Sequence, residues 1–184
     1  MGTEQVGPAF DTPPPRRRGG KVLYLDFDGA VHPSEVWLVK GYGPQLIGCP
    51  GHKLFEHCPV LERELAPYPN VAIVLSTSWV VNYRGSIHRL AKRLTPGLAA
   101  RVIGATFHSR MDRQQFAELP RGLQIFADVI RRRPSSWVAI DDDDQDWPNW
   151  CRDRLVLTDS HDGLGSTGAI NTLRELLREM SAKE

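Results

Sequence analysis

Four aspartates, in two groups far apart in the sequence, are the side chains best suited to chemistry. Asp26 and Asp28 follow a short apolar run and precede Gly29. Asp141 and Asp142 follow another apolar run. Carboxylates two positions apart on an extended segment point to the same side, and glycine allows a sharp turn directly after them. Closely packed carboxylates are costly unless a cation neutralises them, and oxygen ligands favour a hard ion, of which Mg²⁺ fits best.

Three further residues offer donors to an anionic substrate. Ser76 and Thr77 follow the apolar run 71–75, and Arg121 stands at the start of a helical pattern. A hydroxyl, backbone N–H groups and a guanidinium are the directional donors that phosphate oxygens need. An aspartate is an established nucleophile for phosphate, through an aspartyl-phosphate intermediate, and a bound cation offsets the repulsion between the two anions. The combination predicts a phosphoryl-transfer site.

Five apolar runs precede or separate these residues and are predicted to be strands. They are continuous rather than alternating, which is typical of parallel strands covered on both faces. The runs are 22–25, 71–75, 102–105, 137–140 and 155–157. Helical patterns lie between and after them, with apolar stripes Leu123, Phe126, Ala127, Ile130 and Ile170, Leu173, Leu177, Met180, and weaker patterns over 53–66 and 83–93. We expect an α/β, doubly wound, mainly parallel five-stranded sheet with helices on both faces and ligands at the carboxyl ends of the strands.

Over about residues 21–180, the sequence resembles the haloacid dehalogenase-like (HAD-like) superfamily of phosphatases. The first family motif, an apolar strand ending in Asp-x-Asp-Gly, is matched at 23–29, and the second, a strand ending in Ser or Thr, at Ser76. The lone basic residue of the third motif corresponds to Arg121, and the paired aspartates of the fourth correspond to Asp141 and Asp142. More narrowly, the Ser-x-Ser-Trp segment 76–79 and the Gly-Leu-Gly segment 163–165 are similar to the HAD domain of Swiss Army knife RNA repair proteins.

The resemblance implies a role for each catalytic aspartate. Asp26 attacks phosphorus, and its other oxygen binds Mg²⁺. Asp28 protonates the leaving oxygen and later activates water, and its backbone carbonyl also reaches the metal.

The remaining motif residues are implied to bind phosphate and metal. Ser76 and the amide of Thr77 hold the phosphoryl group, and Arg121 neutralises its charge. Asp141 and Asp142 supply one direct and one water-mediated metal ligand, in either order.

The distribution of charge bears on the partner. The chain carries 23 Lys and Arg against 22 Asp and Glu, a formal net charge of +1. Ten Arg and one Lys nevertheless lie within 84–133, against three acidic residues. Only short connections are available for a cap, so we expect no full cap domain and at most a small lid from residues 31–52. An open site suits the phosphorylated end of a polymer, and the basic stretch suits nucleic acid.

The domain expectation is a flexible Pro- and Arg-rich tail over 1–20, followed by one HAD-like phosphatase domain over 21–184. No apolar run is long enough to span a membrane, and the start of the sequence lacks the pattern of a secretory signal. The three cysteines are sparse and odd in number, which argues against a disulfide framework. We therefore expect a cytoplasmic protein with no membrane association.

Several other residues invite a second function. Cys49, His52, His57 and Cys58 suggest zinc, but their spacing fits no tetrahedral site, and a loop with buried cysteines is favoured. His32 is interpreted as a surface histidine that could also line the site, and Trp79 as packing under the second strand end. Trp147 and Trp150 suit either stacking on a base or a structural helix cap.

The function that these observations favour is a Mg²⁺-dependent phosphomonoester hydrolase acting through an aspartyl-phosphate, on RNA or DNA ends or on nucleotides. One alternative is a non-catalytic nucleic-acid-binding module that keeps the same scaffold. Another is a phosphatase for small metabolites.

Overall fold

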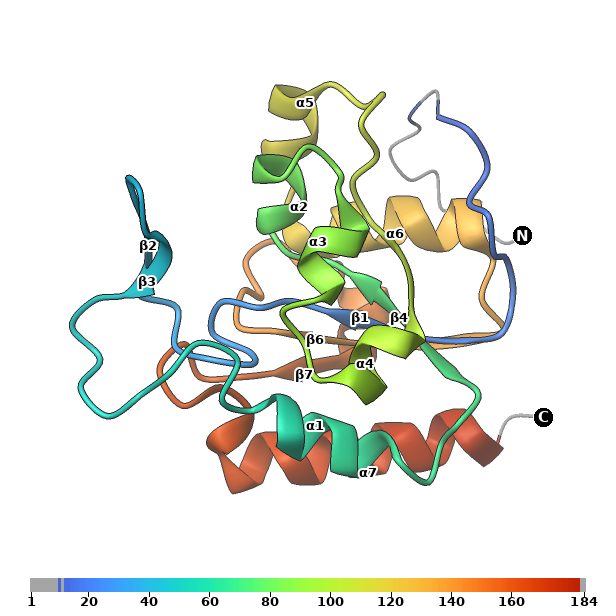
Figure 1. The fold of residues 1–184 in the computed structure, drawn as a ribbon. Coiled ribbons are helices and arrows are strands. Elements are labelled where there is room, and N and C mark those ends of the chain that lie inside the picture. The colour runs from blue at the N-terminus through green and yellow to red at the C-terminus, as the bar shows by residue number, and fades with distance from the viewer. Residues whose placement is uncertain (1–9, 11, 183–184) are drawn as a thin grey trace.

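Five parallel strands form the central sheet of the protein, whose computed structural model describes residue 10 and residues 12–182. The strands lie in the order β5-β4-β1-β6-β7, so β1 is in the middle (Figure 1). Their bounds are β1 Lys21–Leu25, β4 Val71–Leu75, β5 Val102–Ala105, β6 Ser136–Asp141 and β7 Leu155–Leu157. The predicted five-stranded, doubly wound α/β fold is confirmed.

The order of the strands places a switch in winding direction at β1. The chain passes from β1 to β4 and β5 on one side, then returns to β6 and β7 on the other. In open sheets of this kind, ligands bind at the carboxyl ends of the strands beside such a switch point. The last residue of β1, Leu25, pairs with both Leu75 of β4 and Ile140 of β6, so the carboxyl ends of the three strands are level.

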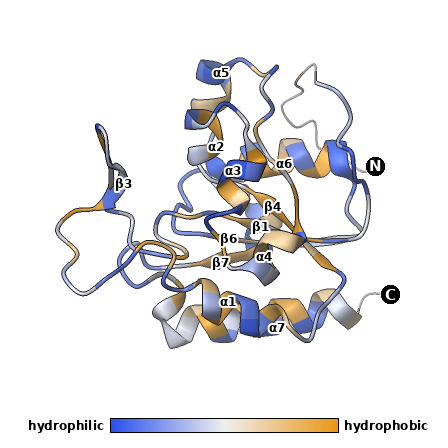
Figure 2. Ribbon diagram, in the orientation of Figure 1, coloured by the Kyte–Doolittle hydropathy of each residue, from blue (hydrophilic) through white to orange (hydrophobic). Residues whose placement is uncertain are grey.

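Helices cover both faces of the sheet, and the side chains of β1 alternate between them. Leu23 and Leu25 belong to the larger apolar cluster, which includes α1 and α7, whereas Val22 and Tyr24 join the smaller one with α6 and η1. Figure 2 shows apolar strands between helices whose colouring alternates. The helices are α1 Cys58–Leu65, α2 Trp79–Asn82, α3 Ile87–Ala91, α4 Pro96–Arg101, α5 Arg113–Ala117, α6 Arg121–Arg132, η1 Asn149–Arg154, η2 Gly163–Gly165 and α7 Thr167–Ala182. Within the described part of the chain, none of them has the length and apolarity that crossing a bilayer requires.

The buried face of α6 differs from its predicted apolar stripe. Ile130 is 42% exposed, whereas Asp128 and Arg132 are almost completely buried. These two polar side chains bind each other and face the core, so pairing, rather than hydrophobicity, decides which side of α6 is buried. The α7 stripe is buried as predicted.

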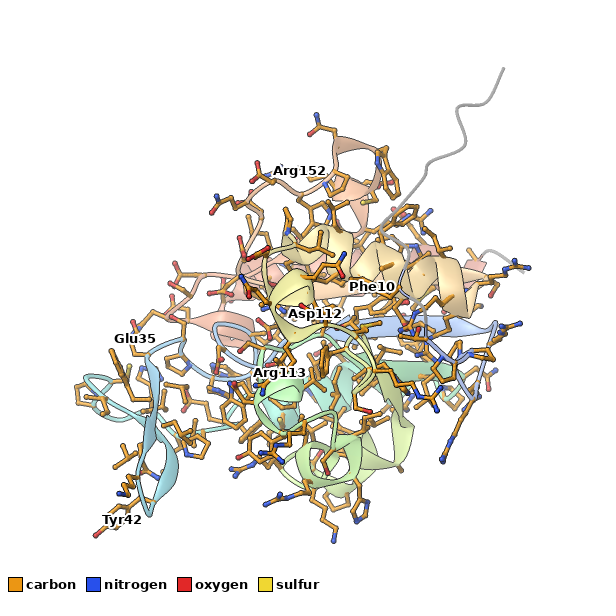
Figure 3. All side chains as sticks on the ribbon, turned by 90° about the horizontal axis from the view of Figure 1, so that it is seen from above. Phe10, Glu35, Tyr42, Asp112, Arg113 and Arg152 are labelled. Carbon is orange, nitrogen blue, oxygen red and sulfur yellow. The ribbon has the colours of Figure 1, made fainter. Side chains whose placement is uncertain are left out.

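A two-stranded antiparallel hairpin, β2 Val36–Val39 and β3 Gly43–Leu46, is the only sheet inserted between β1 and β4 in the described chain. It lies within residues 31–52, the segment expected to form a small lid. The hairpin projects beyond the carboxyl ends of the strands (Figure 1). Figure 3 shows Glu35 at its base and Tyr42 at its tip, where Tyr42 is 81% exposed.

The described part of the N-terminal segment lies against the body of the protein. The ring of Phe10 packs on Phe116 with centroids 5.9 Å apart, and the hydroxyl of Thr12 accepts a hydrogen bond from Arg131. Arg132 donates to the Arg17 carbonyl. The predicted flexible tail covers 1–20, of which residues 1–9 and 11 lie outside the described residues. The contacts of the remaining residues were not anticipated from composition.

Candidate active site

Three carboxylates from two adjacent strands meet at the carboxyl edge of the sheet. Because Leu25 pairs with Leu75 and Ile140, the next residues of the three strands, Asp26, Ser76 and Asp141, are level with one another. One carboxylate oxygen each of Asp26, Asp141 and Asp142 lies within 4.8 Å of the other two. Residues far apart in the sequence therefore converge on one point.

The electrostatics of this group are unfavourable without a ligand. Burial raises the pKa of Asp26, and the neighbouring Asp28 raises it further, while Arg121 opposes them. Burial and the charge of Asp26 raise the pKa of Asp141 well above its ordinary value. The same two causes raise the pKa of Asp142 to about 6. Concentrated negative charge in a buried place is typical of sites that bind a cation or carry out acid–base chemistry.

Arg121 is the cation already present. It begins α6, and its guanidinium lies 3.2 Å from Asp141 and 3.7 Å from Asp26. Gln124, one turn along α6, accepts a hydrogen bond from Arg121 and donates to the carbonyls of Phe116 and Leu119. Burial opposes the charge of Arg121, but the aspartates raise its pKa. The sequence position chosen for the third motif therefore faces the aspartates.

Four buried polar atoms at this edge have no hydrogen-bond partner among the described residues. They are Asp26 Oδ1, Ser76 Oγ, Arg121 Nε and Asp141 Oδ2. Buried polar groups are bonded in the great majority of cases, so an unpaired group indicates a missing ligand. Mg²⁺ binds oxygen at about 2.0–2.1 Å and prefers carboxylates. Arg121 Nε and Asp141 Oδ2 lie 3.2 Å apart as an ion pair without a hydrogen bond, whereas Asp26 Oδ1 and Ser76 Oγ have no hydrogen-bond partner in the described chain. The carboxylate oxygens therefore fit Mg²⁺, and the hydroxyl of Ser76 and the guanidinium of Arg121 fit a phosphate.

Gly29 explains how Asp142 reaches the site. Its φ is +67°, and a Cβ at this position would collide with the carboxylate of Asp142. Glycine adopts this left-handed conformation without strain. The turn is secured by Thr158, whose hydroxyl donates to the Gly29 carbonyl over 2.7 Å.

The carboxylate of Asp28 is held apart from the other three. The indole N–H of Trp79 lies 2.8 and 3.0 Å from its two oxygens, and His32 Nε2 lies 3.1 Å from one of them. The other ring nitrogen of His32 accepts the Phe55 N–H, so Nε2 carries the hydrogen donated to Asp28. Donors on two sides therefore fix the direction in which Asp28 points.

Sequence reasoning gave His32 and Trp79 no part in positioning Asp28. His32 is completely buried rather than a surface residue, and Trp79 is 5% exposed. The only signal was the position of each residue directly after a motif that carries chemistry.

A cavity of about 430 Å³ opens beside Arg121. It is lined by Ser78 and Asn82 near α2, by Glu118 after α5, and by Asp143. Ser76 and Thr77, both buried, lie at the end of β4 just before this wall. The cavity therefore borders Arg121 on the side of α2 and the end of α5.

The two tryptophans after the acidic cluster differ in their surroundings. Trp147 is 3% exposed, and its N–H donates to the Cys151 carbonyl, as a structural residue would. Trp150 is 44% exposed, with its ring against Phe126.

The late glycine signature lies behind the first motif. Leu164 N–H donates to the Ala30 carbonyl, and a Cβ on Gly163 would lie 2.5 Å from the same oxygen. A Cβ on Gly165 would lie 2.9 Å from the ring of His57. The two glycines let this loop approach the turn that follows Asp28.

The comparisons with known proteins give one match. A family model described as the HAD domain in Swiss Army Knife RNA repair proteins matches residues 22–169. No curated protein and no solved structure matches. The matched segment contains every predicted site residue.

Proposed function

Since the chain belongs to the family of HAD domains in Swiss Army Knife RNA repair proteins, we propose that it is a Mg²⁺-dependent phosphomonoester hydrolase. The observation that carries the proposal is the meeting of three carboxylates within 4.8 Å beside a buried arginine. A charge arrangement of this kind costs stability unless a cation and an anion complete it.

Asp26 is the proposed nucleophile. One of its oxygens attacks phosphorus, and the bond from phosphorus to the leaving oxygen breaks, so that an aspartyl-phosphate forms. Asp28 gives its proton to the leaving oxygen, then takes one from the water that attacks the aspartyl-phosphate and releases inorganic phosphate. Trp79 and His32 keep the Asp28 carboxylate directed for both proton transfers.

The other polar residues hold the phosphoryl group. Arg121 and the unpaired hydroxyl of Ser76 are proposed to donate to its oxygens, together with the amide of Thr77. Asp26, Asp141 and Asp142, with the backbone carbonyl of Asp28, would hold Mg²⁺. When bound, the ion supplies positive charge that offsets repulsion between the carboxylates and the phosphate.

Nucleic-acid ends, or nucleotides, are the proposed substrate class. The site has no full cap, and the hairpin beside it exposes Trp37 by 64% and Tyr42 by 81%. Aromatic side chains of this kind stack on bases irrespective of sequence. RNA ends agree with the family to which the chain belongs.

The direct test is phosphate release from p-nitrophenyl phosphate by the purified chain, with Mg²⁺ and with excess chelator. We expect turnover that needs Mg²⁺ and is lost in Asp26→Asn. Asp144→Asn is the matched control, because Asp144 is an exposed acid paired with Arg152 outside the carboxylate group. Mass spectrometry of acid-quenched enzyme should show one added phosphoryl group on Asp26. Unchanged turnover in Asp26→Asn would contradict the proposed mechanism.

A substrate panel separates the alternatives. It comprises oligoribonucleotides and oligodeoxyribonucleotides with a 5′- or a 3′-phosphate, free nucleotides and sugar phosphates. Preference for oligonucleotides supports the proposed class, whereas preference for sugar phosphates indicates a metabolite phosphatase. Salt-sensitive RNA binding without any phosphate release would indicate the non-catalytic binding module.

A further inference from the structure

A second group of metal-ligating side chains lies at the base of the hairpin, away from the carboxylates. Glu35 comes just before β2, Cys49 comes shortly after β3, and His161 lies in the loop after β7. One ligand atom from each lies within 4.8 Å of the other two. The Cys49 sulfur lies 3.3 Å from a Glu35 oxygen. Three segments thus bring a thiol, a carboxylate and an imidazole together.

His52 adds a fourth potential ligand. Its ring lies edge-on to that of His161, with centroids 4.8 Å apart. Its Nδ1 lies 2.6 Å from a carboxylate oxygen of Glu56. Metal-binding histidines almost always use one ring nitrogen for a carboxylate or carbonyl in this way, which orients the other toward the metal. The pairing with Glu56 therefore leaves Nε2 of His52 as the ring nitrogen available to a metal, in the arrangement that metal-binding histidines use.

We propose that Glu35, Cys49 and His161 bind Zn²⁺, with His52 completing a tetrahedral site. Thiolate and imidazole ligands select zinc over magnesium. Zinc bonds of about 2.0–2.3 Å put neighbouring ligand atoms about 3.3–3.7 Å apart, which the Cys49 to Glu35 distance already satisfies. Glu35 and His161 are exposed, and Cys49 is buried. The two exposed side chains can therefore rotate to bring the His161 nitrogen to the same distance from the other two ligand atoms.

The zinc ligands differ from the four residues considered in the sequence. Cys49 and His52 remain. Cys58 is buried in the main core as the first residue of α1, and His57 lies against the glycine loop. The fitting partners, Glu35 and His161, are too far away in the sequence to belong to a short zinc-binding pattern.

The proposed zinc would attach the base of the hairpin to the loop after β7. These segments already touch, because Ser34 N–H donates to the Ser160 carbonyl over 2.8 Å. The metal would hold the hairpin at a defined angle to the carboxyl edge of the sheet. The proposal does not depend on phosphatase activity.

The test uses the metal-free full-length chain and Co²⁺ as a spectroscopic substitute for Zn²⁺. We expect one equivalent of Co²⁺ to give tetrahedral d–d bands and a thiolate-to-cobalt charge-transfer band. One equivalent of Zn²⁺ should abolish both, and millimolar Mg²⁺ should leave them unchanged. Absence of the charge-transfer band in wild-type protein would overturn the proposal.

Variants assign the ligands. Cys49→Ser should lose the charge-transfer band and His161→Ala should weaken Zn²⁺ binding, whereas Cys151→Ser and His88→Ala are controls that should behave as wild type. Circular dichroism checks that each variant is folded. Glu56→Gln, which leaves all four ligands in place, should weaken Zn²⁺ binding about 10–100-fold. Asp141→Asn should retain the band, because Co²⁺ at the all-oxygen carboxylate group gives no thiolate band; loss of the band in this variant would overturn the proposal of a separate site.

Discussion

Helix α6 carries an aspartate–arginine cluster near each end, and the carboxylates of the two clusters differ in hydrogen bonding. Near its C-terminal end, Asp128 accepts hydrogen bonds from Tyr24, Arg131 and Arg132 over distances of 2.7 to 3.2 Å. At its N-terminal end, Arg121 faces Asp26 and Asp141, and each of these three side chains retains a buried atom without a hydrogen-bond partner among the described residues.

Under the proposed function, the Asp128 cluster is structural and the Arg121 cluster binds ligands. Each oxygen of Asp128 accepts two hydrogen bonds, and Arg132 also ties the N-terminal segment to α6 through the Arg17 carbonyl. A buried charge is tolerated when such bonds are complete, and removal of one partner is then strongly destabilising. The Arg121 cluster is incomplete, because it has buried atoms without hydrogen-bond partners in the described chain, as expected of a site whose ligands would supply those bonds.

The largest expected effect is on activity, at the incomplete cluster. Asp141→Asn should lower kcat/KM for a phosphomonoester by about 10³-fold or more, because it removes a charge that the ligands need. Its free energy of unfolding without metal should stay equal to wild type or rise, because a repulsive charge is lost. Steady-state kinetics and urea unfolding measure the two. A clear loss of stability would make this cluster structural as well.

The next effect is on stability, at the complete cluster. Asp128→Asn should lower the free energy of unfolding by about 3–5 kcal/mol, because Arg131 and Arg132 lose their buried partner. Where the variant remains folded, kcat/KM should change far less than in Asp141→Asn. Urea unfolding followed by circular dichroism gives the comparison, and a variant as stable as wild type would contradict it.

A smaller effect on activity is expected from the support of Asp28. Trp79→Phe keeps an aromatic ring beside Phe27 and Tyr83 but removes the N–H that binds Asp28, so kcat should fall about 10–100-fold. The fall in kcat should be larger for an alkyl phosphate than for p-nitrophenyl phosphate. An alkoxide leaving group is a much stronger base than p-nitrophenolate, so its departure depends more on a proton from Asp28. A merely structural role would lower both equally. Trp150→Phe is the control, since Trp150 lies outside the carboxylate group.

The pH dependence of stability gives a finer test of the incomplete cluster. Folding raises the pKa of Asp142 from its ordinary 3.8 to about 6, so its contribution to stability is present below about pH 4 and lost as the pH rises through 6. Without metal, the free energy of unfolding of Asp142→Asn should therefore rise relative to that of wild type between these pH values. After allowance for partial exposure, the gain is about 1–2 kcal/mol. Equal pH profiles in urea unfolding would refute the assignment.

The smallest expected effect is the loss of one bond from the complete cluster. Tyr24→Phe keeps the ring packed on Trp137 and removes a single hydrogen bond to Asp128. The free energy of unfolding should fall by about 0.5–1.5 kcal/mol. Thermal and urea unfolding should agree, and kinetics should be unaffected. A loss as large as that of Asp128→Asn would mean that Tyr24 does more than donate this bond.

The sheet, and the edge at which its polar strand ends meet, could be predicted from the sequence. Continuous apolar runs such as 71–75 are typical of buried strands, and parallel pairing brings their carboxyl ends to one edge. Asp26 and Asp141 are therefore expected at the same edge, and the observed order β4-β1-β6 makes their strands neighbours. Arg121 could be placed because it starts the helix that leads into β6.

Local sequence patterns could not predict which polar residues are buried or what they bind. Asp128 and Arg132 displace Ile130 from the buried face of α6 because they complete each other's hydrogen bonds. In the same way His32, Trp79 and the Glu35 group acquire their roles from partners on other segments. Hydrophobic burial follows local pattern, whereas a buried polar group is tolerated only through partners that the folded chain brings to it.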